Sequence, residues 1–355
     1  MIYILGSINF DLVIFLKKFP EVGETITGNS IFFNLGGKGA NQAIAAKKLN
    51  GDVLFIGRVG DDYFGKYLLN NLNEINLDYQ IKIDKESNTG VALINVDENG
   101  KNKIVLYEGA NGKVGEEEID FLKKKIKKED LLLIQGEIPQ EANLFVSKIS
   151  KEIGVTIIFD PAPAKREFLE FLPYLTYITP NEVELQILTP EISDLNEKID
   201  YLIGNGVYGV IAKLGDKGVI YKDKDNRFFK FDAFKVNAID TTAAGDIFNG
   251  AFATCLDKNL DLKYSLKFSL AASAISVTRK GASVSCPNYD EVIKFLEDQD
   301  EKNNSWYWLW DWWCHCNYDS FNLWEWSWNK SYHYCYRKYI CWSGNEKCFK
   351  VVRFF

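Results

Sequence analysis

The sequence is poor in cysteine and in uninterrupted apolar segments. Only Cys255 and Cys286 occur among the first 300 of the 355 residues, so this region has no disulfide framework and suits a reducing, cytoplasmic environment. No segment has the roughly 18 consecutive apolar residues that a membrane span needs. The start, Met1-Ile2-Tyr3-Ile4-Leu5-Gly6, lacks the basic residues that open a signal peptide and is typical of a first strand.

The sequence also has fewer basic than acidic residues, 42 against 49. The formal net charge is −7 at pH 7 and the isoelectric point is about 5.2. This balance argues against nucleic acid or an anionic membrane as the main partner. Small anionic ligands are not excluded, because local backbone amides bind them irrespective of the net charge.

The end of the sequence, residues 300–355, differs in composition from the rest. All nine tryptophans, both histidines and five of the seven cysteines follow Asn304. None of the cysteine pairs there has the gap of about two to four residues that is usual for a zinc knuckle, which weakens a metal-binding interpretation. We therefore expect an appended segment outside the fold, whose removal near Gln299 preserves activity and improves solubility.

Strand-like and helix-like segments alternate over residues 1–299. Apolar runs such as Leu131-Leu132-Leu133-Ile134, Val155-Thr156-Ile157-Ile158-Phe159 and Val210-Ile211-Ala212 are continuous, as expected for strands buried on both faces of a sheet. Each run follows a helical pattern. The sequence therefore predicts one α/β domain with a mostly parallel sheet that helices cover on both faces.

Two regions interrupt this alternation, at about residues 12–35 and 88–109. In the second region, two alternating runs flank Asn99-Gly100, a dipeptide that is the strongest short signal for a hairpin. We interpret both regions as one small antiparallel sheet that projects from the main domain as a candidate lid. Its open edges would suit pairing with the lid of a second copy, so a homodimer is expected.

The segment Asp240-Thr241-Thr242-Ala243-Ala244-Gly245-Asp246 carries the most direct sign of chemistry. It runs into a helix, whose free first-turn amides would form an anion site beside Asp246. A carboxylate at such a site suits phosphoryl transfer, because it takes a proton from the attacking hydroxyl while backbone dipoles stabilise the moving phosphoryl group. The plainer interpretation is that Asp246 only caps the helix.

The glycine-rich segment Gly36–Gln42 fits neither common nucleotide-binding motif. Phe32 occupies the place of the first glycine of a Walker motif, and Gln42 stands where a dinucleotide fingerprint has its third glycine. The segment can still bring backbone close to a small polar ligand, with Lys38 and Asn41 available for hydrogen bonds.

Seven short blocks occur in an order and spacing that are specific to one family. They are Gly6–Asp11, Gly36–Gln42, Gly57–Gly65, Asp160–Ala164, Thr179–Glu182, Asp240–Gly250 and Val277–Ala282. On these blocks, residues 1 to about 299 resemble the PfkB carbohydrate kinase family. The resemblance implies a ribokinase-like three-layer α/β/α domain with a mostly parallel central sheet, a small antiparallel β lid, and ATP-dependent phosphorylation of a sugar.

The resemblance implies a catalytic turn and a sugar site. It makes Ala244, Gly245 and Asp246 catalytic: Asp246 would deprotonate the sugar hydroxyl, and the amides around it would stabilise the transition state. The positions that match the sugar site are Asn9, Asp11, Gly37, Lys38, Asn41, Glu137 and Asp246. We expect Asn9 and Asp11 at the end of the first strand, where the two carboxylate oxygens of Asp11 would accept hydrogen bonds from vicinal hydroxyls.

The resemblance also implies a nucleotide site and Mg²⁺. The loop Lys213-Leu214-Gly215-Asp216-Lys217-Gly218 matches an ATP-binding turn between two strands, although Lys213 stands where close relatives often carry threonine. Asn181 and Glu184 match a motif near phosphate and magnesium, and Gly245 would also contact the nucleotide. On its own, Asn181 would be an ordinary helix cap.

A monovalent cation site, expected to take K⁺, is implied beside the anion site. The matching positions are Asp240, Thr242, Ser276, Arg279, Gly281 and Ser285. Several of them would contribute backbone carbonyls, so geometry matters more there than side-chain identity. The plainer interpretation of Arg279 with Lys280 is a solvated charge pair at the end of a helix.

Together, the residues and the resemblance predict ATP-dependent phosphorylation of D-ribose at its 5-hydroxyl, giving ribose 5-phosphate and ADP. The alternatives are a kinase for another pentose or a nucleoside, such as a deoxyribose kinase, and a catalytically silent sugar-binding regulator. The intact Gly245 and Asp246 argue against the silent regulator.

Overall fold

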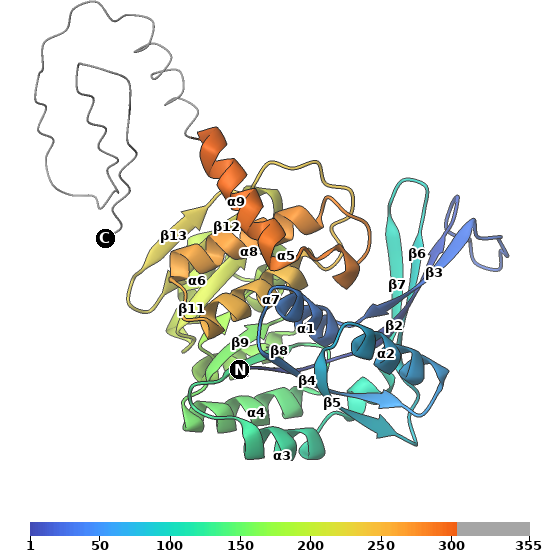
Figure 1. Cartoon of the computed structure of the whole chain (residues 1–355), viewed down its shortest axis with the longest axis horizontal. Helices are drawn as coiled ribbons and strands as arrows, with labels where there is room; N and C mark the ends of the chain where they lie inside the picture. The colour runs from blue at the N-terminus through green and yellow to red at the C-terminus, as the bar shows by residue number, and fades with distance from the viewer. Residues whose placement is uncertain (304–355) are drawn as a thin grey trace, which may run out of the picture. The chain divides into compact units, whose positions relative to one another are not determined.

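The computed structural model of the protein describes residues 1–303. Met1–Glu301 form one compact unit, which contains a large sheet, a small sheet and the helices around them (Figure 1). The expectation that residues 300–355 are an appended segment falls almost entirely outside the described residues and stays a prediction.

The large sheet has nine strands within the described residues, in the order β13-β12-β11-β10-β9-β8-β1-β4-β5. Neighbours from β11 to β5 pair in parallel, whereas β12 and β13 add antiparallel strands at one edge. The strands are β1 (Ile2–Leu5), β4 (Val53–Gly60), β5 (Asp78–Asp84), β8 (Leu131–Gln135), β9 (Thr156–Asp160), β10 (Tyr177–Ile178), β11 (Gly209–Lys213), β12 (Val219–Asp223) and β13 (Phe228–Phe231). The mostly parallel sheet is confirmed, and the three apolar runs noted in the sequence form β8, β9 and β11.

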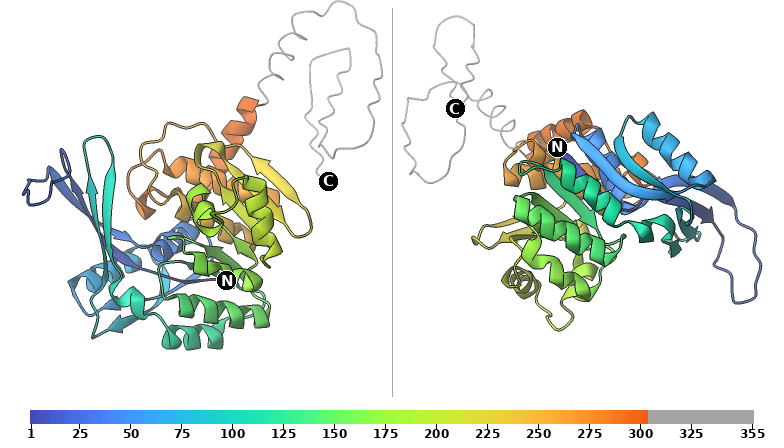
Figure 2. Two further views of the ribbon diagram at one scale, coloured as in Figure 1. Left: turned by 180° about the vertical axis from the view of Figure 1, so that it is seen from behind. Right: turned by 90° about the horizontal axis from the view of Figure 1, so that it is seen from below.

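Helices cover both faces of this sheet, as the views in Figure 2 show. Ile2 and Ile4 of β1 belong to one buried cluster and Tyr3 and Leu5 to the other, because alternate residues of a strand point to opposite faces. The cluster that contains Ile2 includes residues of α1 (Lys38–Lys48), α2 (Tyr63–Glu74), α7 (Ala244–Asp257) and α8 (Leu262–Ser276). The other includes residues of α3 (Glu116–Lys125), α4 (Gln140–Ile153), α5 (Glu182–Leu188) and α6 (Leu195–Gly204). This is the expected three-layer α/β/α arrangement.

One more helix and four short 3₁₀ helices complete the part of the chain that the structure describes. α9 (Tyr289–Asn303) packs on α7 and α8 through a third buried cluster that includes Val292, Ile247 and Phe268. The 3₁₀ helices are η1 (Gly109–Lys113), η2 (Arg166–Tyr174), η3 (Gly215–Lys217) and η4 (Ser283–Ser285). No helix in residues 1–303 has the length and apolar character to cross a membrane.

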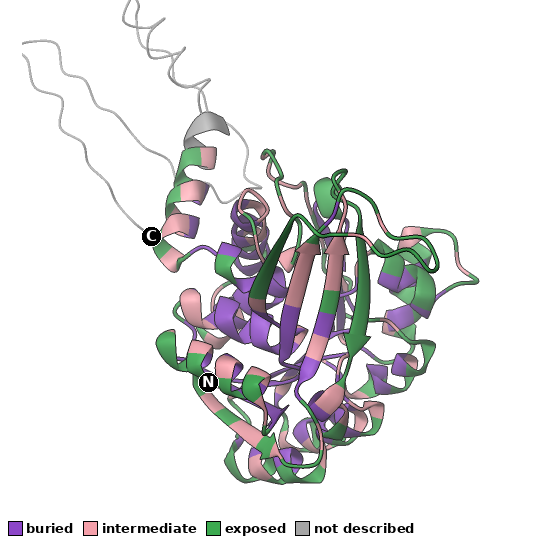
Figure 3. Cartoon of the chain, turned by 90° about the vertical axis from the view of Figure 1, so that its right-hand side faces the viewer, coloured by how far each residue is buried: buried purple, intermediate pink, exposed green. Residues whose placement is uncertain are grey.

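The small sheet is built from both regions that interrupted the alternation, as predicted. Its strands are β2 (Asn9–Phe15), β3 (Ser30–Gly36), β6 (Gly90–Val96) and β7 (Asn102–Tyr107), in the order β3-β2-β6-β7. The two outer pairs are antiparallel, and the β6–β7 turn contains Asn99-Gly100, but the inner pair β2–β6 is parallel. The reason is that β2 and β6 both run outward from the body of the domain: each is buried at its start and more exposed at its end (Figure 3).

The position of Asn9 and Asp11 differs from the expectation. They do not lie at the end of the first strand but in β2, one of the two inner strands of the small sheet. The chain leaves the central sheet after Leu5, and residues 6–8 connect it to the small sheet. There β2 begins at Asn9 and pairs with β3. Both side chains are nevertheless buried, because they occupy the end of β2 that lies nearest the body.

Candidate active site

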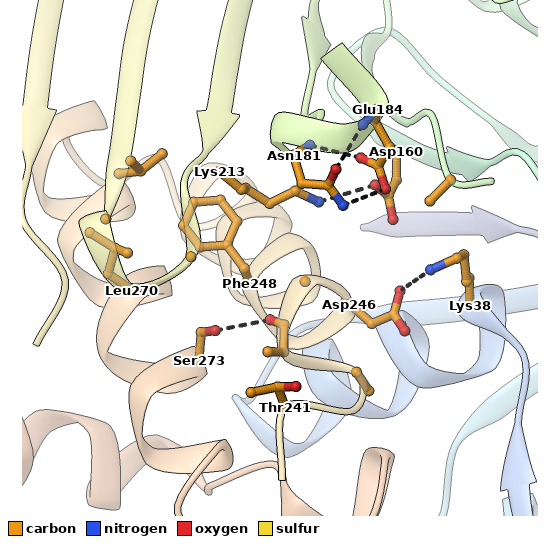
Figure 4. A pocket seen from close by; sticks show the side chains of 17 residues that line it. Lys38, Asp160, Asn181, Glu184, Lys213, Thr241, Asp246, Phe248, Leu270 and Ser273 are labelled. Atoms are coloured by element: carbon orange, nitrogen blue, oxygen red, sulfur yellow. Dashed lines mark hydrogen bonds and ion pairs between the residues drawn. The ribbon is translucent and has the colours of Figure 1, made fainter. Parts of the chain in front are cut away.

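The carboxyl ends of the parallel strands bring polar residues to one edge of the central sheet. Asp160 ends β9 and Lys213 ends β11, and Asn181 follows β10. Ligands bind at this edge in open α/β sheets. A cavity of about 330 Å³ opens there (Figure 4). Nine residues singled out in the sequence line it: Lys38, Asn181, Glu184, Lys213, Gly215, Gly218, Ala244, Gly245 and Asp246.

The first turn of α7 forms one wall of this cavity. Ala243 precedes the helix in the left-handed conformation, with φ 59°. The amide of Ala244 donates to the Thr241 carbonyl at 3.3 Å, whereas the amides of Gly245 and Asp246 have no backbone acceptor in residues 1–303. Free amides and the helix dipole together make this turn an anion site.

The buried carboxylate of Asp246 lies in that first turn and is held by α1. Asn41 Nδ2 donates to Asp246 Oδ2 at 3.1 Å, and Gln42 Nε2 donates to Asp246 Oδ1 at 3.0 Å. Lys38 Nζ lies 3.9 Å from Oδ1, and the two side chains face one another in Figure 4. The N-cap of α7 is Ala243, so Asp246 is not the capping residue that the plainer interpretation required.

The surroundings of Asp246 suit a base. Burial raises the pKa of Asp246, the charge of Asp160 raises this pKa further, and the ammonium of Lys38 opposes both effects. In turn, the charge of Asp246 raises the pKa of Lys38. A carboxylate with a raised pKa binds a proton more strongly, which brings it closer to the range that favours general base catalysis near neutral pH.

Further acceptors gather between the small sheet and α1. Glu137 Oε2 accepts hydrogen bonds from Ser7 Oγ at 2.5 Å and from the amide of Lys38 at 3.0 Å. Asn9 Oδ1 accepts from Asn111 Nδ2 at 2.7 Å. Burial, with the charges of Glu137 and Asp246, raises the pKa of Asp11 to about 7. A set of carboxylates and amides of this kind suits a small ligand with several hydroxyls.

Gly37, which joins β3 to α1, is required by the closeness of β2. Its φ is 88°, a conformation that favours glycine. A Cβ atom there would lie 2.8 Å from the backbone nitrogen of Asn9. Gly37 therefore lets the start of α1, with Lys38 and Asn41, approach the start of β2.

The predicted nucleotide turn joins β11 to β12 and contains η3. Lys213, Gly215 and Gly218 line the cavity, whereas Leu214 is packed in the core. Asp216 and Lys217 are exposed and do not line the cavity. The ammonium of Lys213 lies 3.1 Å from Asp160 Oδ1 at the back of the cavity (Figure 4).

Asn181 and Glu184 cap α5 and also line the cavity. Asn181 Oδ1 accepts from the amide of Glu184 at 2.8 Å, and Glu184 Oε2 accepts from the amide of Asn181 at 2.8 Å. The helix-cap interpretation is thus confirmed, and both side chains still face the cavity. Burial raises the pKa of Glu184, while the charge of Lys213 opposes that shift.

The carboxylates of this cavity suit Mg²⁺ that is shared with substrate phosphates. They do not suit a metal ion that only protein side chains hold. In residues 1–303, no three His, Cys, Asp or Glu residues cluster so that they could hold a metal ion. Mg²⁺ usually keeps several waters and is bound by one or two carboxylates together with substrate phosphates. Glu184 and Asp160 line the cavity and supply such carboxylates.

The residues expected around a monovalent cation are brought together in part. Asp240 accepts from the amide of Thr242 through Oδ1 and from the amide of Gly281 through Oδ2, both at 2.9 Å. The hydroxyls of Ser276 and Ser285 donate to backbone carbonyls, which leaves their oxygen lone pairs available.

Arg279 can contribute only its backbone carbonyl to such a site. Its guanidinium donates to Glu291 Oε1 at 2.5 Å, and a guanidinium has no acceptor. Lys48 reaches the same loop from the end of α1. Its ammonium donates to the carbonyls of Ser283 at 3.0 Å, Val284 at 3.3 Å and Cys286 at 3.4 Å, so three carbonyls near Ser285 already face a positive charge.

Known proteins resemble this chain over most of its length. Residues 1–288 match the model of the pfkB family carbohydrate kinases. The chain belongs to this family. It is 40% identical over 300 residues to a ribokinase of Haemophilus influenzae, which covers 83% of this chain and 97% of that protein. It is 35% identical over 302 residues to a deoxyribokinase of Salmonella typhi, which covers 83% of this chain and 98% of that protein.

Solved structures also support membership of the pfkB family. The structure of Arabidopsis thaliana ribokinase complexed with ribose and ATP matches with a TM-score of 0.76 and 29% identity, covering 83% of this chain and 98% of that one. The ribokinase of Thermotoga maritima matches with a TM-score of 0.75 and 38% identity, covering 83% of this chain and 99% of that one. The protein is therefore a phosphotransferase of the pfkB family.

Three buried residues of this pfkB kinase site were not identified from the sequence. Gln42 and Asp160 contact Asp246 and Lys213, and Asn111 fixes Asn9 through the bond described above. One signal was available for Asp160, because it is a charged residue that ends a continuous apolar run. Gln42 and Asn111 carry no comparable signal, since Asp160 and Asp246, which Gln42 contacts, and Asn9, which Asn111 contacts, lie more than 100 residues away in sequence.

Proposed function

We propose that the protein transfers the γ-phosphoryl group of ATP to the 5-hydroxyl of D-ribose, giving ribose 5-phosphate and ADP. The observation that carries the proposal is the buried Asp246 carboxylate in the first turn of α7, beside free backbone amides and next to the cluster of hydroxyl-binding groups. The ribokinases among the relatives, one of them solved with ribose and ATP, support the choice of substrates.

The sugar would bind between the small sheet and α1. Asp11 and Glu137 would accept hydrogen bonds from ribose hydroxyls, and Asn9, Lys38 and Asn41 would complete the set, with Gly37 allowing close approach. Asn111 would hold Asn9 in place through its hydrogen bond to Asn9 Oδ1. In this pose the 5-hydroxyl would be directed at Asp246.

The base and the anion site would act together on the reacting atoms. Asp246 removes the proton of the 5-hydroxyl, whose oxygen attacks the γ-phosphorus. The free amides of Gly245 and Asp246 would stabilise the charge on the transferred phosphoryl group, and the amide of Ala244 would join them on releasing the Thr241 carbonyl. The small sheet, as a lid, would exclude water that otherwise consumes ATP.

The nucleotide would lie along the β11–β12 turn. We assign Lys213, Gly215 and Gly218 to phosphate and backbone contacts, since they line the cavity, and the neighbouring Leu214, Asp216 and Lys217 to the conformation of the turn. Asn181 and Glu184 would hold hydrated Mg²⁺ against the phosphates. When bound, Mg²⁺ would neutralise negative charge on the β- and γ-phosphates.

An ADP-release assay tests this function directly. With ATP and Mg²⁺, the protein should release ADP when D-ribose is added and only slowly without sugar. A panel of D-ribose, 2-deoxyribose and ribonucleosides separates the alternatives, since the deoxyribokinase among the relatives makes 2-deoxyribose the main competitor. Higher kcat/KM for 2-deoxyribose or a nucleoside would reassign the substrate. If none of these compounds causes ADP release, the protein is a sugar-binding regulator and not a kinase.

We further propose a K⁺ site beside the anion site. Asp240 and Ser276, together with carbonyls of Thr242, Arg279, Gly281 and Ser285, supply the oxygens that would hold the ion. Support comes from the hydrogen bonds that bring Asp240 to Thr242 and Gly281, and from the hydroxyl oxygens that keep free lone pairs. The ion would order the loop that follows α8 without touching the substrates.

With magnesium fixed, KCl should give a clearly higher kcat than NaCl or LiCl at equal ionic strength. K⁺ should also raise the melting temperature, because a ligand that binds only the folded state stabilises it. Asp240→Asn should remove most of the difference between the salts. Equal rates and equal melting temperatures in all three salts would contradict the site.

We also propose a cytoplasmic homodimer. Large apolar side chains of the small sheet are exposed: Phe15, Ile31, Phe32, Phe33, Leu93, Ile104, Val105 and Leu106. An exposed apolar set of this size normally meets a partner, and a second copy of the sheet would cover it. Molar mass from light scattering is the measurement. Cys255 and Cys286 are unpaired and buried, which suits a reducing compartment.

A further inference from the structure

The face of the small sheet that carries Asp11 also carries Asn34. Asn34 of β3 lies directly opposite Asp11 of β2 in the antiparallel pair. Residues that are directly opposite in such a pair point to the same face of the sheet. Asn34 is half-buried, and its side-chain amide has no hydrogen-bond partner in residues 1–303. An amide offers two donors and one acceptor, so Asn34 brings unused hydrogen-bonding capacity to this face.

This face of the small sheet is turned toward the candidate active site. Burial raises the pKa of Asp11, and the charges of Glu137 and Asp246 raise it further, so both carboxylates lie near that of Asp11. Asn9, two residues before Asp11, points to the same face, because side chains alternate along a strand. A sugar bound between these groups and the small sheet would therefore meet the side chain of Asn34.

Gly36 explains why Asp11 and Asn34 make no hydrogen bond with one another. A Cβ atom on Gly36 would lie 2.1 Å from Asp11 Oδ2, so the carboxylate covers Gly36 and takes the place of the missing side chain. Gly36 and Asn34 are on the same face of β3, two residues or about 6.6 Å apart. This spacing leaves room for a hydroxyl group between the carboxylate and the amide, since two hydrogen bonds through one oxygen span about 5.6 Å.

The other neighbours of Asp11 on this face cannot take the place of Asn34. Val13 is the next residue of β2 on the same face, and Ala92 of β6 lies beside Asp11 on the side away from β3. Both are apolar. Asn9 lies one position nearer the body and is already assigned to the sugar site. Of these four neighbours, Asn34 is the one that can donate to a hydroxyl held by Asp11 and that the proposed function leaves unused.

We propose that Asn34 is a specificity-determining residue that recognises, together with Asp11, the vicinal 2- and 3-hydroxyls of ribose. The inference rests on the proposed function, in which ribose binds at Asp11. One of the two hydroxyls donates a hydrogen bond to the Asp11 carboxylate and accepts one from the Asn34 amide, so that hydroxyl is satisfied both as donor and as acceptor. A sugar without it leaves the carboxylate and the amide unpaired, and a site of this kind discriminates against such a sugar.

The sugar selectivity of an Asn34→Leu variant tests the proposal. Leucine keeps the approximate size of asparagine and removes both polar groups. We expect the KM for ribose to rise by about 5 to 10-fold, as for one lost hydrogen bond, with kcat within about twofold of the parent value. The preference for ribose, as a ratio of kcat/KM values, should fall by about 5 to 10-fold against either 2-deoxyribose or 3-deoxyribose. The deoxy sugar that shows the change identifies the hydroxyl.

Asn95→Leu is the matched control. Asn95 on β6 is also half-buried, but it lies on the opposite face of the small sheet, so this variant should behave as the parent protein. An unchanged KM for ribose in Asn34→Leu, or an unchanged preference against both deoxy sugars, would overturn the proposal. The same changes in Asn95→Leu would also overturn it. If Asn34→Leu does not fold, judged by its melting temperature, Asn34→Ala replaces it with the same expected results.

Ribose affinity from titration calorimetry separates this proposal from the proposed function, because binding needs no turnover. Asn34→Leu should bind ribose about 5 to 10-fold more weakly than the parent protein. If it does so while the parent protein fails to phosphorylate ribose, the proposed function is contradicted and the assignment of Asn34 to the sugar stands. Equal affinity in the two proteins overturns that assignment, and absence of ribose binding by the parent protein overturns both.

Discussion

Asp246→Asn should lower kcat by on the order of 10² to 10⁴-fold, because asparagine keeps the shape of the side chain but cannot accept a proton. The KM for ATP should change little, since Asp246 has no part in holding the nucleotide. Asparagine also has one acceptor oxygen where the carboxylate has two. One of the two amides that Asn41 and Gln42 donate would lose its partner, so the variant should lose about 1–3 kcal/mol of stability.

Steady-state rates, ADP affinity and melting temperature separate these effects. Asp120→Asn, an exposed aspartate on α3, is the matched control and should match the parent protein in all three. An Asp246→Asn variant that keeps more than about a tenth of the parent kcat would show that Asp246 is not the general base.

Asp11→Asn should act on ribose binding instead of on chemistry. Asparagine offers one acceptor where Asp11 offers two charged ones, and hydrogen bonds to charged groups contribute about 1.5–3 kcal/mol each. We therefore expect the KM for ribose to rise by about 10²-fold, with a smaller change in kcat. An unchanged KM for ribose would remove Asp11 from the sugar site.

The same substitution should stabilise the protein without ligand in a pH-dependent way. The pKa of Asp11 is about 7 in the folded protein against an ordinary value of 3.8, so the folded state binds the extra proton between these values. The cost of the buried charge therefore grows from about pH 4 to pH 7 and is complete above pH 7. Asp11→Asn should raise the melting temperature at pH 8 and change it little at pH 4. A gain of equal size at both pH values, or the same gain in Asp120→Asn, would contradict this assignment.

Patterns along the chain were sufficient for the layers of the fold. A strand that is buried on both faces consists of consecutive apolar residues, so the positions of β8, β9 and β11 could be predicted from the sequence. The direction of pairing in the small sheet was not visible, because it depends on where the two hairpins leave the body and not on the residues within them. The place of Asn9 and Asp11 was missed for the same reason.

Parts of the candidate site were predictable because they combine a local conformation with reactive groups. The first turn of α7 is such a case, since its small residues and Asp246 are contiguous. Gln42 and Asp160 were not predictable, because Gln42 contacts Asp160 and Asp246 only when α1 is packed against the strand ends and α7. Asp160 and Lys213 end β9 and β11 and both line the cavity, so a charged residue at the end of a continuous apolar run was the usable signal for this part of the candidate site.

The chain passes between the body of the domain and the small sheet four times: before β2, after β3, before β6 and after β7. Asp11 lies just beyond the first of these passages, and Gly37 and Lys38 lie just behind the second. A sugar held by Asp11 on one side and Lys38 on the other would cross-link the sheet to the body at its point of attachment. The bound sugar would then form a fifth connection between the small sheet and the body, and that connection would be lost each time the product dissociates.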